Sequence, residues 1–151
     1  MLKYLQQQSE LTLFEGIKEL RAFEGTNEND LTSKTTQQFM NALEGHDVIH
    51  SLFGCATDVN GEIKVHLWMV FGTTTKMREI KSALGSRDHK ETLKEIGHLN
   101  LLKRWFYAIP MAIKIFALSK RMTKKYPVEN FLNDLNEKLK DIRDEYNIMI
   151  V

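Results

Sequence analysis

The sequence predicts an all-α fold: a single compact domain of about six to seven helices that spans residues 1–151. Three observations lead to this prediction. The chain has only two prolines and eight glycines, and its long stretches rich in Lys, Glu and Leu favour helix over strand. Its 151 residues are enough for one hydrophobic core. One segment has strand character, but no second convincing strand is present to pair with it.

The N-terminal half shows apolar residues at helical spacing. The first predicted helix opens near Ser9, and its apolar stripe is formed by Leu11, Phe14, Ile17 and Leu20. A second helix is expected between the polar turn 25–30 and Gly45, which either ends that helix or marks a bend. Further helices are expected over 77–84 and 92–102.

The segment 46–53 predicts a short helix that buries Ile49, Leu52 and Phe53 and ends at Gly54. Asp58 or Thr57 is the expected cap of the next element. Residues 62–67 alternate polar and apolar, which alone indicates a strand. Because 68–71 is apolar without alternation, we predict a helix over 62–71 instead.

Two prolines punctuate the C-terminal half. Pro110 is expected to kink or break the helical run around it, because it lacks an amide hydrogen and its ring clashes with the preceding turn. Pro127 suits the start of a C-terminal amphipathic helix. The apolar stripe of that helix is formed by Phe131, Leu132, Leu135, Leu139, Ile142 and Tyr146.

Composition and charge limit the functions that the sequence can support. The net charge is +1, so overall basicity does not support nucleic-acid binding. The single cysteine, Cys55, cannot form an intrachain disulfide, which favours a reducing compartment and a packed thiol. Residues 1–10 lack the features of a signal or transit peptide, and no run of about 18 apolar residues predicts a membrane span. We therefore expect a cytoplasmic protein.

The stretch 100–125 is basic and rich in aromatic residues. Across 96–128 there are seven Lys or Arg residues and no acidic residue. One interpretation is a buried helix whose lysine tips are solvated. The other is an element at a membrane surface, with aromatic rings at headgroup depth and cations on anionic lipid. In the second interpretation the membrane or lipid contacts are Lys103, Arg104, Trp105, Phe106 and Lys114.

Two histidines four residues apart, His46 and His50, are the main candidates for chemistry. On a helix this spacing places both rings on one face. There they can bind a divalent metal together with a carboxylate from the next segment, for which Glu62 is the candidate. An ordinary polar helix face produces the same pattern. His66, one turn after Glu62, is either an extra ligand or a partly exposed histidine.

Asp47 follows His46, about 100° further around the helix. Zinc hydrolases with paired histidines have Glu at this position, where it acts as general base, and Asp47 is one methylene shorter. Asp47 is therefore either a metal ligand or a catalytic group that orients a histidine ring. Its oxygen atoms make magnesium or manganese possible alongside zinc.

The run His46-Asp47-Val48-Ile49-His50, followed after eleven residues by Glu62, resembles the signature of the coenzyme Q (ubiquinone) biosynthesis protein 4 family. That family has HDxxH, eleven residues and then Glu, usually within Gly-Glu-Ile, as in Gly61-Glu62-Ile63. Gly54, four residues after the second histidine, and Arg143, before a short apolar tail, agree with the family. The resemblance covers 44–151 and only loosely the N-terminal third, which is shorter than usual.

The resemblance implies an all-helical protein, often a homodimer, bound peripherally to the inner face of a membrane. It implies a divalent metal, most often zinc, on four ligands: His46, Asp47, His50 and Glu62. The family acts on a lipid substrate, the polyprenylated hydroxybenzoate precursor of ubiquinone, from which it removes the C1 carboxylate and installs oxygen. It has also been regarded as a scaffold for other ubiquinone-biosynthesis proteins.

Two hypotheses follow from these features. The first is a metal-dependent enzyme of the oxidative decarboxylase type, acting on a prenylated aromatic acid. The alternative is a non-catalytic lipid-binding or scaffold protein that organises a ubiquinone-biosynthesis complex. Metal ligands alone do not separate the two, because a structural site uses the same residues. A metallohydrolase would need more Asp and His ligands than the sequence offers.

Overall fold

The computed structural model describes residues 2–25, 45–75 and 98–151, although for 98–107 it describes the helix and not the side chains. These residues form five α-helices and two 3₁₀ helices, with no β-strand among them. The elements are η1 (Lys3–Leu5), α1 (Leu13–Phe23), α4 (Gly45–Leu52), α5 (Val59–Phe71), α8 (His98–Ser119), η2 (Val128–Asp134) and α9 (Leu139–Tyr146). The predicted all-α fold is confirmed. The helices expected between 30 and 44 and over 77–84 lie outside the described residues.

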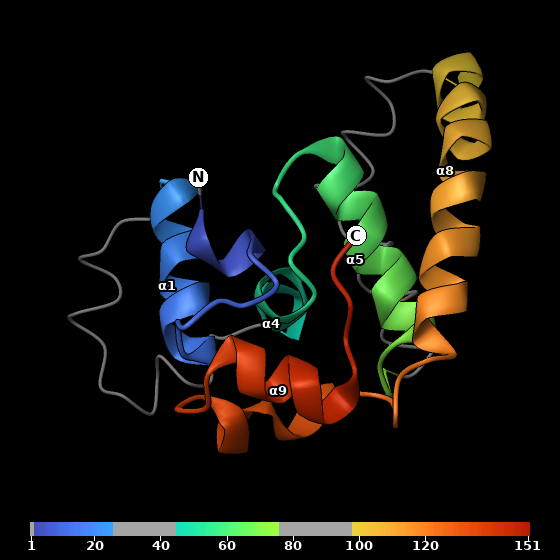
Figure 1. Ribbon diagram of the computed structural model, residues 1–151. Coiled ribbons are helices and arrows are strands. Elements are labelled where there is room, and N and C mark those ends of the chain that lie inside the picture. The colour runs from blue at the N-terminus through green and yellow to red at the C-terminus, as the bar shows by residue number, and fades with distance from the viewer. Residues whose placement is uncertain (1, 26–44, 76–97) are drawn as a thin grey trace.

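Helix α4 lies at the centre of the fold (Figure 1). Helix α1 packs on one side of it and α5 on the other, α8 lies against the outer face of α5, and η2 and α9 lie across one end. Ile49, Leu52 and Phe53 are fully buried, as predicted. The Phe53 ring stacks on Trp68 of α5, with the ring centroids 4.6 Å apart. This packing fixes α4 and α5 side by side.

Helix α1 begins later than the sequence pattern indicates, at Leu13 and not near Ser9. The reason is a capping box formed by Thr12 and Glu15. The Glu15 amide donates to the Thr12 hydroxyl at 3.2 Å, and the Thr12 amide donates to the Glu15 carboxylate at 2.9 Å. Both bonds satisfy amides that the first helical turn leaves without partners.

The C-terminal amphipathic segment forms two helices, η2 and α9, where one was predicted. A continuous helix would pair the Leu135 carbonyl with the Leu139 amide. Instead the Leu135 carbonyl accepts from Phe14, and the Leu139 amide donates to the Leu11 carbonyl. The start of α1 thus takes the hydrogen bonds that would have continued the helix. Leu132 of the predicted stripe is 43% exposed, and its other five members are buried.

Of the kink or break predicted at Pro110, the break does not occur, since α8 runs through it to Ser119. A proline inside a helix costs about 3 kcal/mol, and the burial of Ile115 in the core helps to offset that cost. Pro127 directly precedes η2, in agreement with its predicted place at a helix start. None of the described helices is long and apolar enough to cross a membrane.

The side chain of Arg143 on α9 joins three distant segments. It is fully buried, and its guanidinium donates to five backbone carbonyls, those of Tyr4, Gln6, Gln7, Ser51 and Leu52. Burial lowers the pKa of Arg143 to about 10, so it remains charged at neutral pH. Two of the carbonyls lie at the C-terminal end of α4, where the helix dipole is negative and carbonyls lack helical partners. Backbone dipoles therefore compensate the buried charge.

Replacing Arg143 should destabilise the whole fold. We expect Arg143→Met to lower the free energy of unfolding by about 3–5 kcal/mol, because the five buried carbonyls lose their donors. Urea unfolding followed by circular dichroism measures this loss. The exposed Arg121 provides a matched control, and Arg121→Ala should change the free energy by less than about 0.5 kcal/mol. Equal effects of the two substitutions would contradict the assigned role of Arg143.

Candidate metal centre

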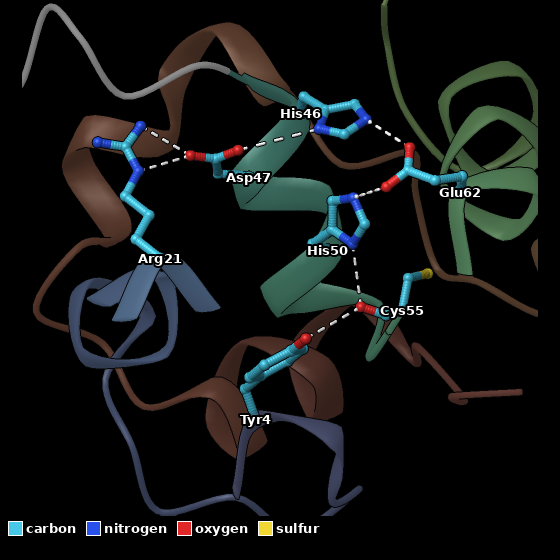
Figure 2. A network of polar contacts seen from close by, with 7 residues as sticks. All are labelled: Tyr4, Arg21, His46, Asp47, His50, Cys55 and Glu62. Atoms are coloured by element: carbon cyan, nitrogen blue, oxygen red, sulfur yellow. Dashed lines mark hydrogen bonds and ion pairs between the residues drawn. The ribbon is translucent and has the colours of Figure 1, made fainter. Parts of the chain in front are cut away.

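Helices α4 and α5 bring together three side chains that could hold a metal ion (Figure 2). Nε2 of His46 lies 3.3 Å from Oε2 of Glu62, and Nε2 of His50 lies 3.0 Å from Oε1 of the same carboxylate. One ligand atom from each residue lies within 4.8 Å of those of the other two. The predicted group of His46, His50 and Glu62 is therefore assembled.

The turn after α4 fixes the orientation of the His50 ring. Gly54 has a left-handed backbone, with φ of 62°, and the Cys55 amide donates to the His50 carbonyl at 2.9 Å. This is a Schellman motif, which requires a glycine-like conformation at that position. The turn places the Cys55 carbonyl 3.0 Å from Nδ1 of His50. Because a carbonyl can only accept, Nδ1 carries a proton and donates it.

The other ring nitrogen of His50 is buried and directed at Glu62. His50 is 1% exposed, and within the described residues its Nε2 makes no hydrogen bond, although Oε1 of Glu62 lies 3.0 Å away. In the neutral ring both facing atoms carry lone pairs. Their approach is favourable only with a proton or a metal cation between them. This arrangement fits a cation site with imidazole and carboxylate ligands.

Glu62 is held in place by the tight start of α5. Asp58 caps this helix, as predicted, and its carboxylate accepts from the Gly61 amide at 2.8 Å. A Cβ atom on Gly61 would lie 1.7 Å from the Ala56 carbonyl oxygen. Only glycine permits this contact between α5 and the connection before it. The contact sets the position of Glu62, the next residue.

The charges of the site depend on one another. Burial opposes ionisation of Glu62, but the two histidine rings that face its carboxylate, at 3.3 Å and 3.0 Å, hold its pKa well below the ordinary value. Burial likewise opposes a charge on His46, but the carboxylates of Asp47 and Glu62 raise the pKa of His46 to about 9. At neutral pH a protonated His46 therefore faces an ionised Glu62. A divalent cation would displace that proton, because a ligating imidazole is neutral.

Asp47 lies on the side of His46 that faces away from Glu62 (Figure 2). Its Oδ1 is 3.9 Å from Nδ1 of His46, and its Oδ2 accepts from Nε and Nη2 of Arg21, each at 2.7 Å. Burial opposes its charge, but His46 and Arg21 hold the pKa of Asp47 below its ordinary value. The structure thus brings three of the four predicted ligands together and places the fourth against Arg21. The ligand or catalytic role of Asp47 stays a prediction.

Arg21 of α1 and Glu24, which caps the C-terminal end of that helix, border the site, and sequence reasoning identified neither. Arg21 contacts Asp47 directly. The carboxyl of Glu24 lies close enough that burial, together with the negative charges of Asp47 and Glu62, raises its pKa. Arg21 lies in the last turn of α1, and Glu24 directly follows its last residue, so both lie at the same end of that helix. No local sequence pattern, however, links that helix end to His46.

His66 and Cys55 lie near the group without belonging to it. Nδ1 of His66 lies 2.7 Å from the Glu62 carbonyl, and its ring centroid is 6.2 Å from that of His46. The Cys55 side chain is fully buried, and burial raises its pKa to about 12, so the thiol stays protonated. A protonated, packed thiol is a poor metal ligand. This agrees with the packed thiol that the sequence predicts.

The predicted lipid contacts fall on α8. The side chains of Lys103, Arg104, Trp105 and Phe106 lie outside the described residues. Lys114 is described, and it is exposed. The structure therefore describes the side chain of only one of the five residues, and their contact with lipid stays a prediction.

Comparisons with protein-family models, with curated proteins and with solved structures found no match to this chain. Its class is therefore defined by the fold and by the group at the junction of α4 and α5. That class is a helical protein with a candidate metal centre made of two histidines and a glutamate.

The contact at Gly61 should control the metal centre. We expect Gly61→Ala to weaken Zn²⁺ binding at least about 10-fold, because the added Cβ overlaps the Ala56 carbonyl and displaces Glu62. Asn60→Ala, an exposed change in the same turn, is the matched control and should keep the wild-type affinity. Titration against a chromogenic zinc indicator measures both. Unchanged affinity in Gly61→Ala would show that this contact does not position Glu62.

Proposed function

We propose that this protein binds a divalent metal ion, zinc before magnesium or manganese, through His46, His50 and Glu62. The observation that carries the proposal is the buried Nε2 of His50, directed at the Glu62 carboxylate while Nδ1 is already bonded to the Cys55 carbonyl. Two imidazoles and a carboxylate are a set that zinc uses in catalytic sites, where a further position stays open for water or substrate. His46 and Glu62 are 31% and 35% exposed, so solvent reaches the group.

The metal proposal is tested by affinity measurements on purified protein. We expect His50→Ala to bind Zn²⁺ at least about 100-fold more weakly than wild type, because it removes the buried ligand. His66→Ala, one turn along α5 from Glu62, is the matched control and should stay within about threefold of wild type. Competition with a chromogenic chelator measures the affinities. Wild-type protein that binds no Zn²⁺, or His50→Ala that binds it equally well, would refute the proposal.

We further propose that the metal site serves ubiquinone biosynthesis, with a polyprenylated hydroxybenzoate as the lipid substrate. The support is the resemblance to the coenzyme Q biosynthesis protein 4 family, whose spaced motif coincides with the group. Gly54 and Gly61, which belong to that resemblance, form the turns that orient His50 and Glu62. The spacing of the motif and the local geometry of this site thus agree on His46, His50 and Glu62.

The proposed reaction replaces the C1 carboxylate of the aromatic ring by a hydroxyl group. The bond between the ring and the carboxylate breaks and CO₂ leaves, while a new bond forms between C1 and an oxygen atom that water supplies. Molecular oxygen, the external oxidant, accepts the two electrons and two protons and leaves as hydrogen peroxide. A bound zinc ion would supply Lewis-acid stabilisation of negative charge on a substrate oxygen. The buried His50 and the ionised Glu62 would hold the cation, and the partly exposed His46 would leave the site open toward a substrate at the surface.

A non-catalytic lipid-binding or scaffold protein is the second candidate function. It is favoured by exposed apolar side chains on α8, where Ile109, Ile113 and Phe116 are 47%, 64% and 46% exposed. Lys114 of α8 and Lys120, which directly follows the last residue of α8, are exposed as well. Apolar residues beside lysines suit peripheral contact with an anionic membrane, and a second copy in a homodimer would also cover them. Other ubiquinone-biosynthesis proteins would then be partners.

A turnover assay separates the enzyme from the scaffold. Zinc-loaded protein, given carboxyl-labelled polyprenyl hydroxybenzoate in anionic vesicles under air, should release labelled CO₂. Glu62→Gln keeps the side-chain shape but removes the charge, so we expect the rate to fall at least about 100-fold. Protein that binds zinc and floats with the vesicles but releases no label would instead support the scaffold.

A further inference from the structure

We propose that Arg21 is a positioning residue of the metal centre, which acts through Asp47 on the ring of His46. The inference rests on the proposed metal binding by His46, His50 and Glu62. It gives Arg21 and Asp47 a defined place outside the ligand set.

The first step is the contact between Arg21 and Asp47, which joins α1 to α4. Nε and Nη2 of the guanidinium both donate to Oδ2 of the carboxylate at 2.7 Å. The two side chains are only 14% and 17% exposed, so water screens the pair weakly. A planar guanidinium that uses two nitrogens fixes the orientation of a carboxylate, which a lysine does not. Both contacts go to one oxygen and leave Oδ1 directed at His46 (Figure 2).

The second step is the relation of Asp47 to the His46 ring. Oδ1 lies 3.9 Å from Nδ1, while Nε2 on the far side of the ring faces Glu62 at 3.3 Å. An imidazole that ligates through Nε2 carries its proton on Nδ1, and a nearby carboxylate is a usual acceptor for it. At 3.9 Å the Asp47 carboxylate is near Nδ1 but too far away for a hydrogen bond. A small rotation of the His46 ring would bring the two atoms within hydrogen-bond distance.

The two histidines differ in what holds Nδ1. For His50 the acceptor is the Cys55 carbonyl, and the ring is 1% exposed. His46 is 31% exposed, and no backbone carbonyl is seen to hold its ring among the described residues. The carboxylate held by Arg21 stands in the equivalent place. We infer that the Asp47 carboxylate orients the ring of the partly exposed His46, as the Cys55 carbonyl orients the ring of the buried His50.

An inner-ligand role for Asp47 fits this geometry less well. Its carboxylate is on the Nδ1 side of His46, away from the Nε2 atom that faces Glu62. To reach a metal beside Glu62 it would have to give up both contacts with Arg21. The arrangement therefore favours Asp47 as an orienting group.

The direction of the effect of Arg21 on zinc affinity separates these roles. Removing a positive charge near a cation site strengthens cation binding by simple electrostatics. If the loss of Arg21 released Asp47 to become an additional ligand, zinc binding would also become stronger. If Arg21 positions Asp47 and His46, its loss makes zinc binding weaker. Only the positioning role predicts weaker binding in Arg21→Met.

The experiment measures Zn²⁺ affinity of the full chain by chelator competition. We expect Arg21→Met and Asp47→Asn each to bind about 10–100-fold more weakly than wild type. The double variant should be no weaker than the weaker single variant, because both act through one link. Lys18→Met removes an exposed charge one turn earlier on α1 and serves as the matched control, with affinity unchanged or slightly tighter. Arg21→Lys, which keeps the charge but not the fork, should fall between wild type and Arg21→Met.

A spectroscopic readout distinguishes positioning from a general effect on folding. In ¹⁵N-labelled, zinc-loaded protein, the Nδ1 proton of His46 should exchange slowly with water and become fast in Arg21→Met, while that of His50 stays slow. Equal or tighter Zn²⁺ binding in Arg21→Met, or additive effects in the double variant, would overturn the inference. If Arg21→Met does not fold, Asp47→Asn and Arg21→Lys decide in its place. Wild-type protein that binds no Zn²⁺ would refute the metal proposal itself, which is a separate outcome.

Discussion

The buried guanidinium of Arg143 is the interaction on which the rest of the structure depends. It belongs to α9, yet its bonds end on carbonyls of the N-terminal segment and of the last turn of α4. Ser51 and Leu52, which supply two of these carbonyls, directly precede the turn at Gly54. That turn places the Cys55 carbonyl against His50. The bonds that hold three distant segments together thus also fix the chain beside the buried His50.

This anchoring explains why the two histidines differ. His50 lies next to the anchored turn, inside the core, and its ring is held by backbone. His46 lies one turn away at the edge of the core, where its ring faces Asp47, which is in turn held by Arg21 of α1. The candidate site therefore has one side chain held by the core and one that is partly exposed at its edge.

What the sequence could predict was encoded locally. The stop at Gly54, the cap at Asp58 and the ligand group depend on residues within one short span, where spacing and turn chemistry carry the information. What it could not predict depends on long-range bonds. A charged residue in an amphipathic pattern is expected at the surface, so Arg143 could not be identified as buried. The split between η2 and α9 arises because Phe14, far away in sequence, uses the Leu135 carbonyl.

The structure also gives a physical reason for the number of residues between His50 and Glu62. Between them lie the last residues of α4, a left-handed turn, a capping residue and the first turn of α5. One residue more within α5 would rotate Glu62 by about 100° around the helix axis and away from both rings. Gly54 reverses the chain, and Gly61 lets α5 start against the Ala56 carbonyl. The eleven residues between the second histidine and the glutamate are therefore a constraint on backbone geometry, and the position of Glu62 relative to both rings depends on these two glycines.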